Sequence, residues 1–178
     1  MILKVIKYLK KQLLFIYDKS GTMYYRSQGV NIGSNCSFIG KKINFSSEQY
    51  LVTIGNNCRI SFEVCFITHD GGTHILRKKF PEICIYGPIV IGNNVFIGAR
   101  SMILPNVKVG NNVIIGAGAL VTKSIPDNEV WGGVPARKIC TVEEYVSKNQ
   151  KNFSYILNKP YKEKKRILLN RYNKQNIN

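Results

Sequence analysis

The sequence predicts a mainly β fold, a parallel β-helix with a protruding loop and short helices at its ends. The first observation is an aliphatic residue that returns at every sixth position over six repeats. These residues are Ile91, Ile97, Ile103, Val109, Ile115 and Val121. The second is that glycine follows four of them, and that asparagine pairs at 93–94 and 111–112 stand where the chain must turn tightly.

A period of six matches neither the 3.6-residue repeat of an amphipathic helix nor the two-residue alternation of a strand. It matches short strands separated by tight turns, with one aliphatic side chain of each strand pointing inward. Three such strands would close one triangular coil of about eighteen residues. Stacked coils bury an aliphatic column that a single coil could not bury alone. A sandwich or barrel would need the same spacing by accident, so we favour the β-helix.

The same rhythm continues more weakly toward the N-terminus. Members of these earlier repeats are Ile32, Phe38, Ile54, Ile60 and Phe66. Cys36 and Cys58 each lie four residues after an inward aliphatic residue, in the slot that small side chains occupy. We therefore predict that both cysteines pack in the core.

Residues 68–84 interrupt the repeat, because the six-residue frame that follows them is out of phase with the frame before them. The segment holds both histidines of the chain, a glycine pair and a proline. We interpret it as a loop that leaves the β-helix surface. A loop that departs from a rigid scaffold is where functional residues are expected.

The chain is expected to have three parts: a basic and helical N-terminal segment, the β-helix and a basic helical extension. These parts are residues 1–28, 29–139 and 140–178. A short helix is expected over residues 2–17. Two further helices, over 141–149 and 161–173, would cover the last coil and shield its open strand edges.

The formal net charge of +16 lies mainly in the two ends. Residues 1–28 carry six Lys and Arg residues against one acid, residues 137–178 carry eleven against three, and the middle carries nine against six. The ends are either solvated or attracted to an anionic partner such as a nucleotide or a lipid carrier. Residues 2–17 would either pack across the β-helix end or make peripheral membrane contact. No nucleic-acid-binding motif accompanies the charge, so nucleic acid is not expected as a partner.

Composition and cysteine usage favour a cytoplasmic protein. No apolar run approaches the roughly 20 residues that a membrane span needs, and the N-terminal residues lack the cleavage site of a secretion signal. The five cysteines are odd in number and form no CxxC pair. Neither a disulfide framework nor a metal site is therefore expected.

The two histidines of the chain, His69 and His74, both lie in the predicted loop. An imidazole has an ordinary pKa of about 6.5, so it can accept and return a proton near neutral pH. His69 follows a rigid strand directly, whereas His74 lies further out. His69 is therefore the stronger candidate for a general base. Asp70 would orient His69, contact the substrate or simply be solvated.

Three stretches of the sequence resemble the hexapeptide acyltransferases of the maltose and galactoside acetyltransferase group and their capsule and lipopolysaccharide O-acetyltransferase relatives. They are Thr-His at 68–69, VTIGNN at 52–57, and the block at 87–139 that ends in VTKSIPDNEVWGGVPARKI. The resemblance implies a left-handed β-helix and a homotrimer with sites between subunits. It also implies acetyl transfer from acetyl-CoA to a sugar hydroxyl in capsular polysaccharide or lipopolysaccharide biosynthesis, without a metal.

The resemblance assigns coenzyme contacts to five positions. The backbone at Ala99 and Ala117 matches groups that hydrogen-bond the pantetheine arm, although both could be small turn residues only. Thr122 and Lys123 match contacts near the nucleotide end. Arg137 matches a phosphate-binding position, for which a guanidinium is suited by its fork of donors. Lys123 and Arg137 could equally be solvated.

The resemblance also concerns catalysis and the acceptor. His69 matches the catalytic base, and the transfer it serves is direct, without an acyl-enzyme. Asn44 matches a substrate-contacting asparagine over only two residues, and Asp70 is the second candidate for an acceptor contact. The chain departs from the pattern at Phe96, where many sugar acetyltransferases have Trp, and at Cys140, where a basic residue often stands.

Three alternatives stay open at this point. The same scaffold could acetylate the amine of an amino nucleotide sugar. A gamma-type carbonic anhydrase is also a β-helix trimer, and His69 and His74 have the spacing of two of its three zinc ligands, but the chain has no third histidine. A non-catalytic β-helix protein is the remaining possibility, because a fold does not dictate a function.

Overall fold

The computed structural model describes residues 6, 9, 21–40 and 42–173. The chain divides into two compact units, of which the first ends at Tyr145 and the second begins at Val146. The helix predicted over residues 2–17 lies outside the described residues except for positions 6 and 9. None of the described helices combines the length and apolarity needed to cross a bilayer.

The first unit is mainly β, as predicted, and most of its described strands belong to three sheets. The first sheet has the strand order β1-β3-β8-β11, the second β2-β4-β9-β12-β14-β15 and the third β5-β10-β13. Within these sheets every strand pair is parallel except β14 with β15. Two isolated bridges extend the stacks, Asn44 with Cys65 and Val109 with Ile125.

The strands are short, as the six-residue period requires. The first sheet contains β1 (Asn31–Ile32), β3 (Val52–Ile54), β8 (Ile89–Ile91) and β11 (Lys108–Val109). The second contains β2 (Ser37–Phe38), β4 (Arg59–Ile60), β9 (Phe96–Ile97), β12 (Ile114–Ile115), β14 (Glu129–Gly132) and β15 (Arg137–Thr141). The third contains β5 (Cys65–Phe66), β10 (Met102–Ile103) and β13 (Leu120–Val121).

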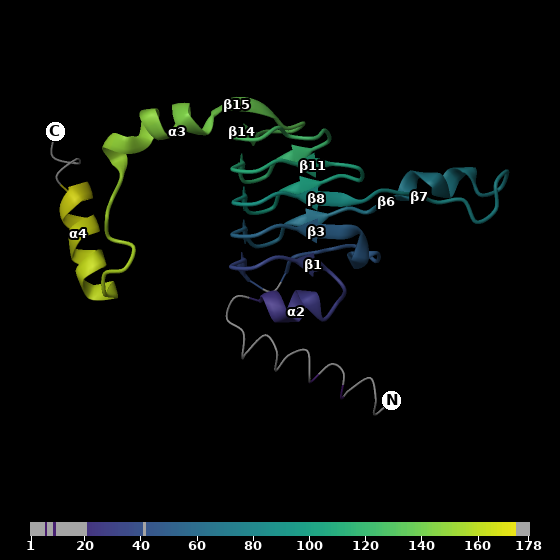
Figure 1. Ribbon diagram of the computed structural model, residues 1–178, viewed down its shortest axis with the longest axis horizontal. Coiled ribbons are helices and arrows are strands. Elements are labelled where there is room, and N and C mark those ends of the chain that lie inside the picture. Colours follow the sequence, from purple (N-terminus) through teal and green to yellow (C-terminus); the bar gives the residue numbers. More distant parts are fainter. Residues whose placement is uncertain (1–5, 7–8, 10–20, 41, 174–178) are drawn as a thin grey trace. The chain divides into compact units, whose positions relative to one another are not determined.

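The chain visits the first, second and third sheets in turn and then returns to the first, so that strands of one sheet stack above one another (Figure 1). Between the turns that begin at β8 and β11 the paired residues lie 18 positions apart, as in Ile97 with Ile115 and Ile103 with Val121. Three hexads therefore complete one turn. We call the bend from the first to the second sheet the first corner, the next bend the second corner, and the return to the first sheet the third corner.

The inward residues of the three sheets form one continuous core. Those of the hexad frame are 0–1% exposed from Ile54 to Val121. Burying one such side chain fully contributes about 1.5–3 kcal/mol. Cys36 and Cys58 are buried in the same core, as predicted, and the Cys58 Sγ–H donates to the Gly92 carbonyl at 3.1 Å. Burial raises the pKa of Cys58 to about 11, so this thiol stays protonated.

Asparagines build the first corner. Asn57, Asn94 and Asn112 have φ angles of 57°, 54° and 54°, a left-handed conformation that asparagine tolerates well. Their neighbours tie one turn to the next, because the Asn111 side-chain oxygen accepts from the Asn93 amide at 2.9 Å. At Gly92 an added Cβ would lie 2.5 Å from the Gly110 carbonyl, so only glycine allows this stacking distance.

An excursion leaves the third corner between β5 and β8. It contains β6 (His69–Asp70), the 3₁₀ helix η2 (Gly71–Leu76) and β7 (Ile85–Tyr86). β6 pairs antiparallel with β7, His69 opposite Tyr86, and the Gly87 amide donates to the Thr68 carbonyl at 2.9 Å. Figure 1 shows this excursion projecting from the stack of strands. The sequence predicts the loop over residues 68–84, whereas the excursion begins with β6 at His69 and its strand β7 ends at Tyr86.

The two ends of the first unit are closed differently. Helix α2 (Thr22–Arg26) places Tyr25 over the first turn, where its ring lies 4.9 Å from Phe38 and 5.1 Å from Phe45. At the other end β15 pairs with β14 and occupies the edge of the second sheet. Helix α3 (Val142–Asn149) follows β15 directly, at the junction of the two units.

The second unit contains η3 (Gln150–Asn152) and α4 (Tyr161–Asn173). Helices α3 and α4 lie where the sequence predicts them, within one residue at each boundary. In the second unit Lys159 and Glu163 form an ion pair at 2.6 Å beside the start of α4.

Replacing an inward hexad residue should destabilise the stack, whereas replacing an outward residue of the same sheet should not. We expect Ile91→Ala to lower the free energy of unfolding by about 2–5 kcal/mol, because Ile91 is 1% exposed. Lys108→Ala, on the outer surface of β11, should change it by about 0.5 kcal/mol or less. Urea unfolding of the three proteins measures both effects, and equal losses would contradict the inward assignment.

Candidate active site

His69 is held where the excursion leaves the third sheet. The preceding residue, Thr68, is fully buried, and its amide and carbonyl are both engaged by backbone and side-chain partners. His69 itself is the first residue of β6, and its ring stands edge-on to Tyr86 with the centroids 6.2 Å apart. The backbone of His69 is therefore anchored next to the buried Thr68, and Tyr86 of β7 packs against one side of the imidazole ring.

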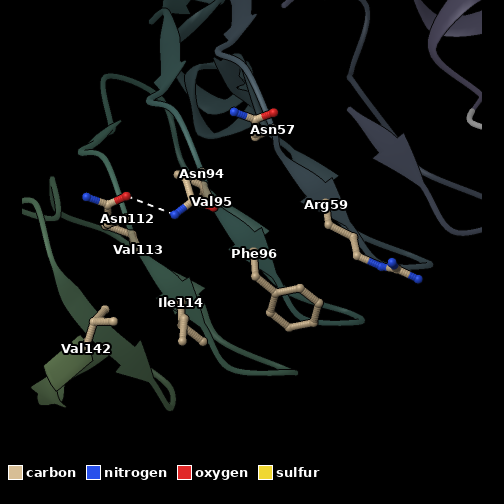
Figure 2. Close-up of a pocket in the computed structure, with 9 residues that line it drawn as sticks. All are labelled: Asn57, Arg59, Asn94, Val95, Phe96, Asn112, Val113, Ile114 and Val142. Atoms are coloured by element: carbon tan, nitrogen blue, oxygen red, sulfur yellow. Dashed lines mark hydrogen bonds between the residues drawn. The ribbon is translucent and has the colours of Figure 1, made fainter. Parts of the chain in front are cut away.

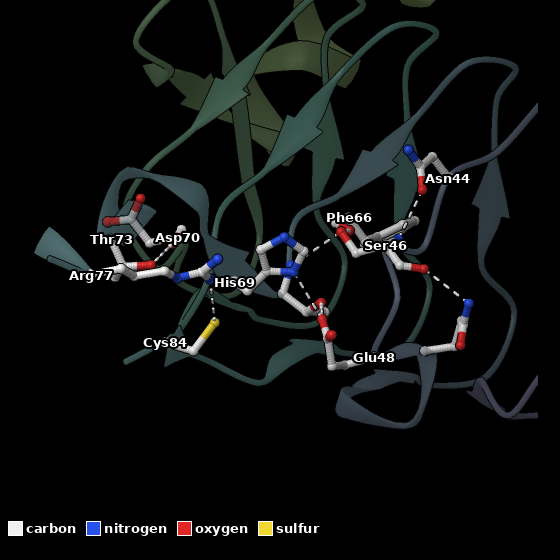
Figure 3. Close-up of polar contacts among 11 residues, drawn as sticks. Asn44, Ser46, Glu48, Phe66, His69, Asp70, Thr73, Arg77 and Cys84 are labelled. Atoms are coloured by element: carbon white, nitrogen blue, oxygen red, sulfur yellow. Dashed lines mark hydrogen bonds and ion pairs between the residues drawn. The ribbon is translucent and has the colours of Figure 1, made fainter. Parts of the chain in front are cut away.

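Glu48, which the sequence analysis did not select, is the partner of His69. Its Oε2 lies 2.9 Å from His69 Nδ1 and accepts a hydrogen bond of 2.7 Å from the Thr68 hydroxyl (Figure 3). These contacts, with a further one from Ser47, lower the pKa of Glu48 from its ordinary 4.5 to about 2. The carboxylate is thus ionised throughout the neutral range.

Glu48 reaches this position because the turn before it is pinned. Ser46 has a φ of 54°, its amide donates to the Asn44 side-chain oxygen at 2.8 Å, and its hydroxyl donates to the Phe66 carbonyl at 2.9 Å. The following 3₁₀ helix η1 (Gln49–Leu51) leads into β3. The segment lies on the third corner, one turn before His69, so the two side chains meet across successive turns.

A carboxylate can only accept a hydrogen bond, so His69 Nδ1 carries the proton in this contact. The other ring nitrogen, Nε2, is then unprotonated in the neutral imidazole and can accept a proton. The His69 side chain is 35% exposed, whereas that of Glu48 is 15% exposed. The pair therefore has a sheltered anion behind a solvent-facing base, an arrangement suited to general-base catalysis.

A pocket of about 340 Å³ opens beside this pair. It is lined by Ser47, Glu48, His69, Asp70, Gly71, His74, Arg77, Cys84 and Tyr86. All of these residues come from the segment before β3 or from the excursion. The pocket therefore belongs to the third corner, and both histidines line it.

The two residues predicted to contact the acceptor differ in position. Asp70 lines the pocket, but its Oδ1 accepts from the Gly72 amide at 2.8 Å and caps η2. Asn44 lies outside the pocket lining, on the outer surface of the third sheet, and its side-chain oxygen is engaged by Ser46. A substrate contact by either residue stays a prediction.

The five predicted coenzyme residues lie on two different corners. Ala99 and Ala117 stack at the second corner, where the Gly118 amide donates to the Ala99 carbonyl at 2.8 Å. An added Cβ on Gly98 would lie 2.4 Å from the Ala117 nitrogen, so the backbones here approach closely. Thr122 and Lys123 follow β13 and lie exposed at the third corner, on the same edge as His69.

Arg137 lies at the second-corner side of the last turn, opposite Gly132 in the β14–β15 ladder. Its guanidinium is exposed, and Nη1 donates to the Ala136 carbonyl at 2.9 Å. The neighbouring Lys138 is committed to Glu129, with the two charged atoms 2.7 Å apart. One chain thus does not bring His69 together with Ala99, Ala117 and Arg137.

A second hollow, of about 310 Å³, lies on the outer surface of the second sheet (Figure 2). It is lined by Asn57, Arg59, Asn94, Val95, Phe96, Asn112, Val113, Ile114 and Val142. This lining has no group that could act as a base near neutral pH. The described residues also contain no group of three His, Cys, Asp or Glu side chains placed to hold a metal ion.

Glu48 could have been found from the hexad count. Two hexad steps lead from Phe38 in the second sheet to Ile54 in the first and should take twelve residues, but the two residues are sixteen apart. The chain inserts η1 between the third and first sheets. These extra residues lie at the third corner, one turn before His69, and such an insertion indicates a second segment that could carry functional residues. The contact itself could not be predicted, because it depends on how the two departures from the repeat align.

Residues 88–123 match the family model described as bacterial transferase hexapeptide, six repeats. A Staphylococcus aureus protein called CapG is 51% identical over 154 residues, which cover 86% of this chain and 90% of that protein. The galactoside O-acetyltransferase of Escherichia coli is 39% identical over 120 residues, covering 67% of this chain and 59% of that enzyme. A solved structure of galactoside acetyltransferase in complex with coenzyme A has a TM-score of 0.54 at 27% identity, covering 77% of this chain and 74% of that one.

The lowered pKa of Glu48 predicts a pH-dependent contribution to stability. A carboxyl group with a folded-state pKa of about 2 and an ordinary pKa of 4.5 stabilises the fold fully above about pH 4.5 and loses this effect as the pH falls toward 2. The difference in melting temperature between the parent and Glu48→Gln should therefore shrink across that window. Glu82→Gln removes a carboxylate from the excursion without touching His69 and controls for net charge. A difference that stays constant from pH 2 to 7 would contradict the contact.

Proposed function

Because this chain belongs to the bacterial hexapeptide transferase family, we propose that it transfers an acetyl group from acetyl-CoA to a sugar hydroxyl, with His69 as general base. The observation that carries the proposal is the His69–Glu48 contact of 2.9 Å at the mouth of a pocket. The contact leaves Nε2 of a neutral imidazole available to the acceptor. Relatives that bind coenzyme A and acetylate galactosides support the choice of donor and acceptor.

In the proposed reaction His69 Nε2 takes the proton of the acceptor hydroxyl as its oxygen attacks the thioester carbonyl. The new C–O bond forms, and the C–S bond then breaks as the tetrahedral intermediate collapses. His69 returns the proton to the departing thiolate, so acid–base balance is restored within one turnover. General-base assistance of this kind is worth about 10²–10⁴-fold in rate. Backbone amides would stabilise the developing oxyanion.

Glu48 is proposed as a positioning residue that acts through His69. Its carboxylate selects the Nδ1–H tautomer and faces the positive charge that the ring acquires in the transition state. Thr68 supports this role, because its buried hydroxyl holds the same carboxylate oxygen at 2.7 Å. With a pKa of about 2, Glu48 would not take the proton from His69.

The three-sheet rotation, the 18-residue return and the family membership support a left-handed β-helix with the excursion as its catalytic loop. We propose further that the active unit is a homotrimer. In one chain the third corner carries His69, whereas Ala99, Ala117 and Arg137 lie on the second-corner side. If all of them contact one acetyl-CoA, the second-corner residues must come from a neighbouring subunit.

We propose more specifically that the acceptor is a sugar of capsular polysaccharide or lipopolysaccharide O-antigen. We also propose that the protein acts in the cytoplasm. Resemblance to sugar O-acetyltransferases supports an ester product. Acetylation of an amino nucleotide sugar would give an amide instead. Incubation with acetyl-CoA and candidate glycans, followed by mild base, distinguishes the two, because an ester is hydrolysed and an amide persists.

Removing the base should reduce turnover with little effect on donor binding. We expect His69→Ala to lower kcat by about 10²–10⁴-fold. The KM for acetyl-CoA should change little, because the imidazole acts on the acceptor proton. Mass spectrometry of the acetylated sugar measures the rate without interference from the five cysteines of the chain.

His74→Ala serves as the matched control for this prediction. His74 lines the same pocket, but among the described residues the histidine that is hydrogen-bonded to Glu48 is His69. It should cause a much smaller loss of kcat than His69→Ala. Full activity of His69→Ala would refute the proposed mechanism.

Loss of Arg137 should weaken coenzyme binding through a phosphate. We expect Arg137→Ala to raise the Kd for coenzyme A by about 5–10-fold, a modest effect because the guanidinium is exposed. If the contact is with the 3′-phosphate, the substitution should not alter the Kd for dephospho-coenzyme A. Isothermal titration calorimetry measures both constants. Lys138→Ala, which removes a cation already paired with Glu129, is the control.

A further inference from the structure

The pocket beside His69 contains one permanent cation, Arg77. The anionic side chains in its lining are Glu48 and Asp70. Glu48 Oε2 accepts from both Thr68 and His69, and Asp70 Oδ1 accepts from the Gly72 amide. Both carboxylates are thus engaged within the protein, and neither forms an ion pair with Arg77.

Arg77 lacks a charged partner among the described residues. Its one side-chain contact is between Nη2 and the Cys84 sulfur at 3.9 Å, a weak interaction with a thiol. In the view of Figure 3 the Arg77 side chain extends toward the His69 ring, and a dashed line joins its guanidinium to the Cys84 sulfur. A guanidinium offers five N–H donors in a planar fork, so the hydrogen bonds of the described residues leave most of the donors of this exposed side chain available to a ligand.

The turn that carries Arg77 is fixed to the same strand as the base. Asp70 caps the start of η2, and Arg77 is the residue that ends it. Thr73, which is 3% exposed, donates its hydroxyl hydrogen to the Asp70 carbonyl at 3.1 Å. The Arg77 amide donates to the His74 carbonyl at 3.3 Å. Arg77 is therefore placed by a short hydrogen-bonded turn that begins one residue after His69.

We propose that Arg77 binds an oxyanion on the acceptor, so that the preferred acceptor is a sugar bearing a carboxylate or a phosphate. This inference rests on the proposed function and names the acceptor class of the same site. An arginine fork matches a carboxylate or phosphate with two parallel charge-assisted hydrogen bonds. Lys78 and Lys79 follow on the exposed excursion and add positive potential that attracts such acceptors.

The test compares acceptors that differ only in the anionic group. Matched pairs are a methyl hexoside with its hexuronate, and an N-acetylhexosamine with its 1-phosphate. We expect kcat/KM to favour the anionic member of at least one pair by about tenfold or more, and the pair that shows it identifies carboxylate or phosphate as the group bound. Arg77→Gln should abolish that preference mainly through KM, and Arg77→Lys should retain part of it.

Lys78→Gln is the matched control, because it removes the same charge from the next residue without altering the pocket lining. It should change the preference less than twofold. Melting temperatures of the three variants establish that each is folded.

Each of the following results would overturn the inference. Equal kcat/KM values within every pair would show that the site ignores the oxyanion, and equal effects of Arg77→Gln and Lys78→Gln would indicate long-range attraction only. A fall in kcat for neutral and anionic acceptors alike, or a raised KM for acetyl-CoA, would assign Arg77 to the transition state or to the donor. Binding of acetyl-CoA with transfer to no member of the panel would reject the acceptor class alone, whereas absence of both binding and transfer would reject the proposed function.

Discussion

The constraint on which the rest of the structure depends is the parallel pairing of the strands of each turn with those of the next. A strand inside the stack, such as β12, forms hydrogen bonds with the turn before it and the turn after it. A residue inserted within such a strand would therefore break two ladders. Gly92 shows how little room there is, since even a Cβ would collide with the neighbouring carbonyl. Additional residues can therefore leave the stack only at a corner.

Both large departures from the repeat leave at the third corner, one turn apart. The earlier one carries Glu48, and the later one begins with His69. Because stacked corners lie directly above one another, side chains from segments about twenty residues apart meet without either segment needing a long reach. The scaffold thereby supplies the preorganisation that a general base requires, and the ionised carboxylate adds a fixed negative charge beside the ring.

The periodic part of the molecule could be predicted from sequence because each hexad has the same two requirements, an aliphatic side chain that points inward and a tight turn between short strands. The inward aliphatic residues, the left-handed asparagines and the helices α3 and α4 follow from local patterns. Glu48 could not be assigned in the same way, because its role comes from a contact between two non-periodic segments. Asp70 was selected for its place beside His69, and the sequence could not show that one of its oxygens would be used to cap η2.

The proposed base and the proposed acceptor-binding group are held by different parts of the structure. His69 is anchored through Thr68 to the buried core, so its position is set by the stack that every member of such a repeat fold must preserve. Arg77 lies further along the excursion, on a turn whose internal hydrogen bonds do not involve the stacked strands. Under both proposals, a change at Arg77 should alter which acceptor is bound without displacing His69 or Glu48. If both proposals hold, the Arg77 guanidinium, which has no charged partner among the described residues, sets the acceptor preference on a segment separate from the stack that fixes His69.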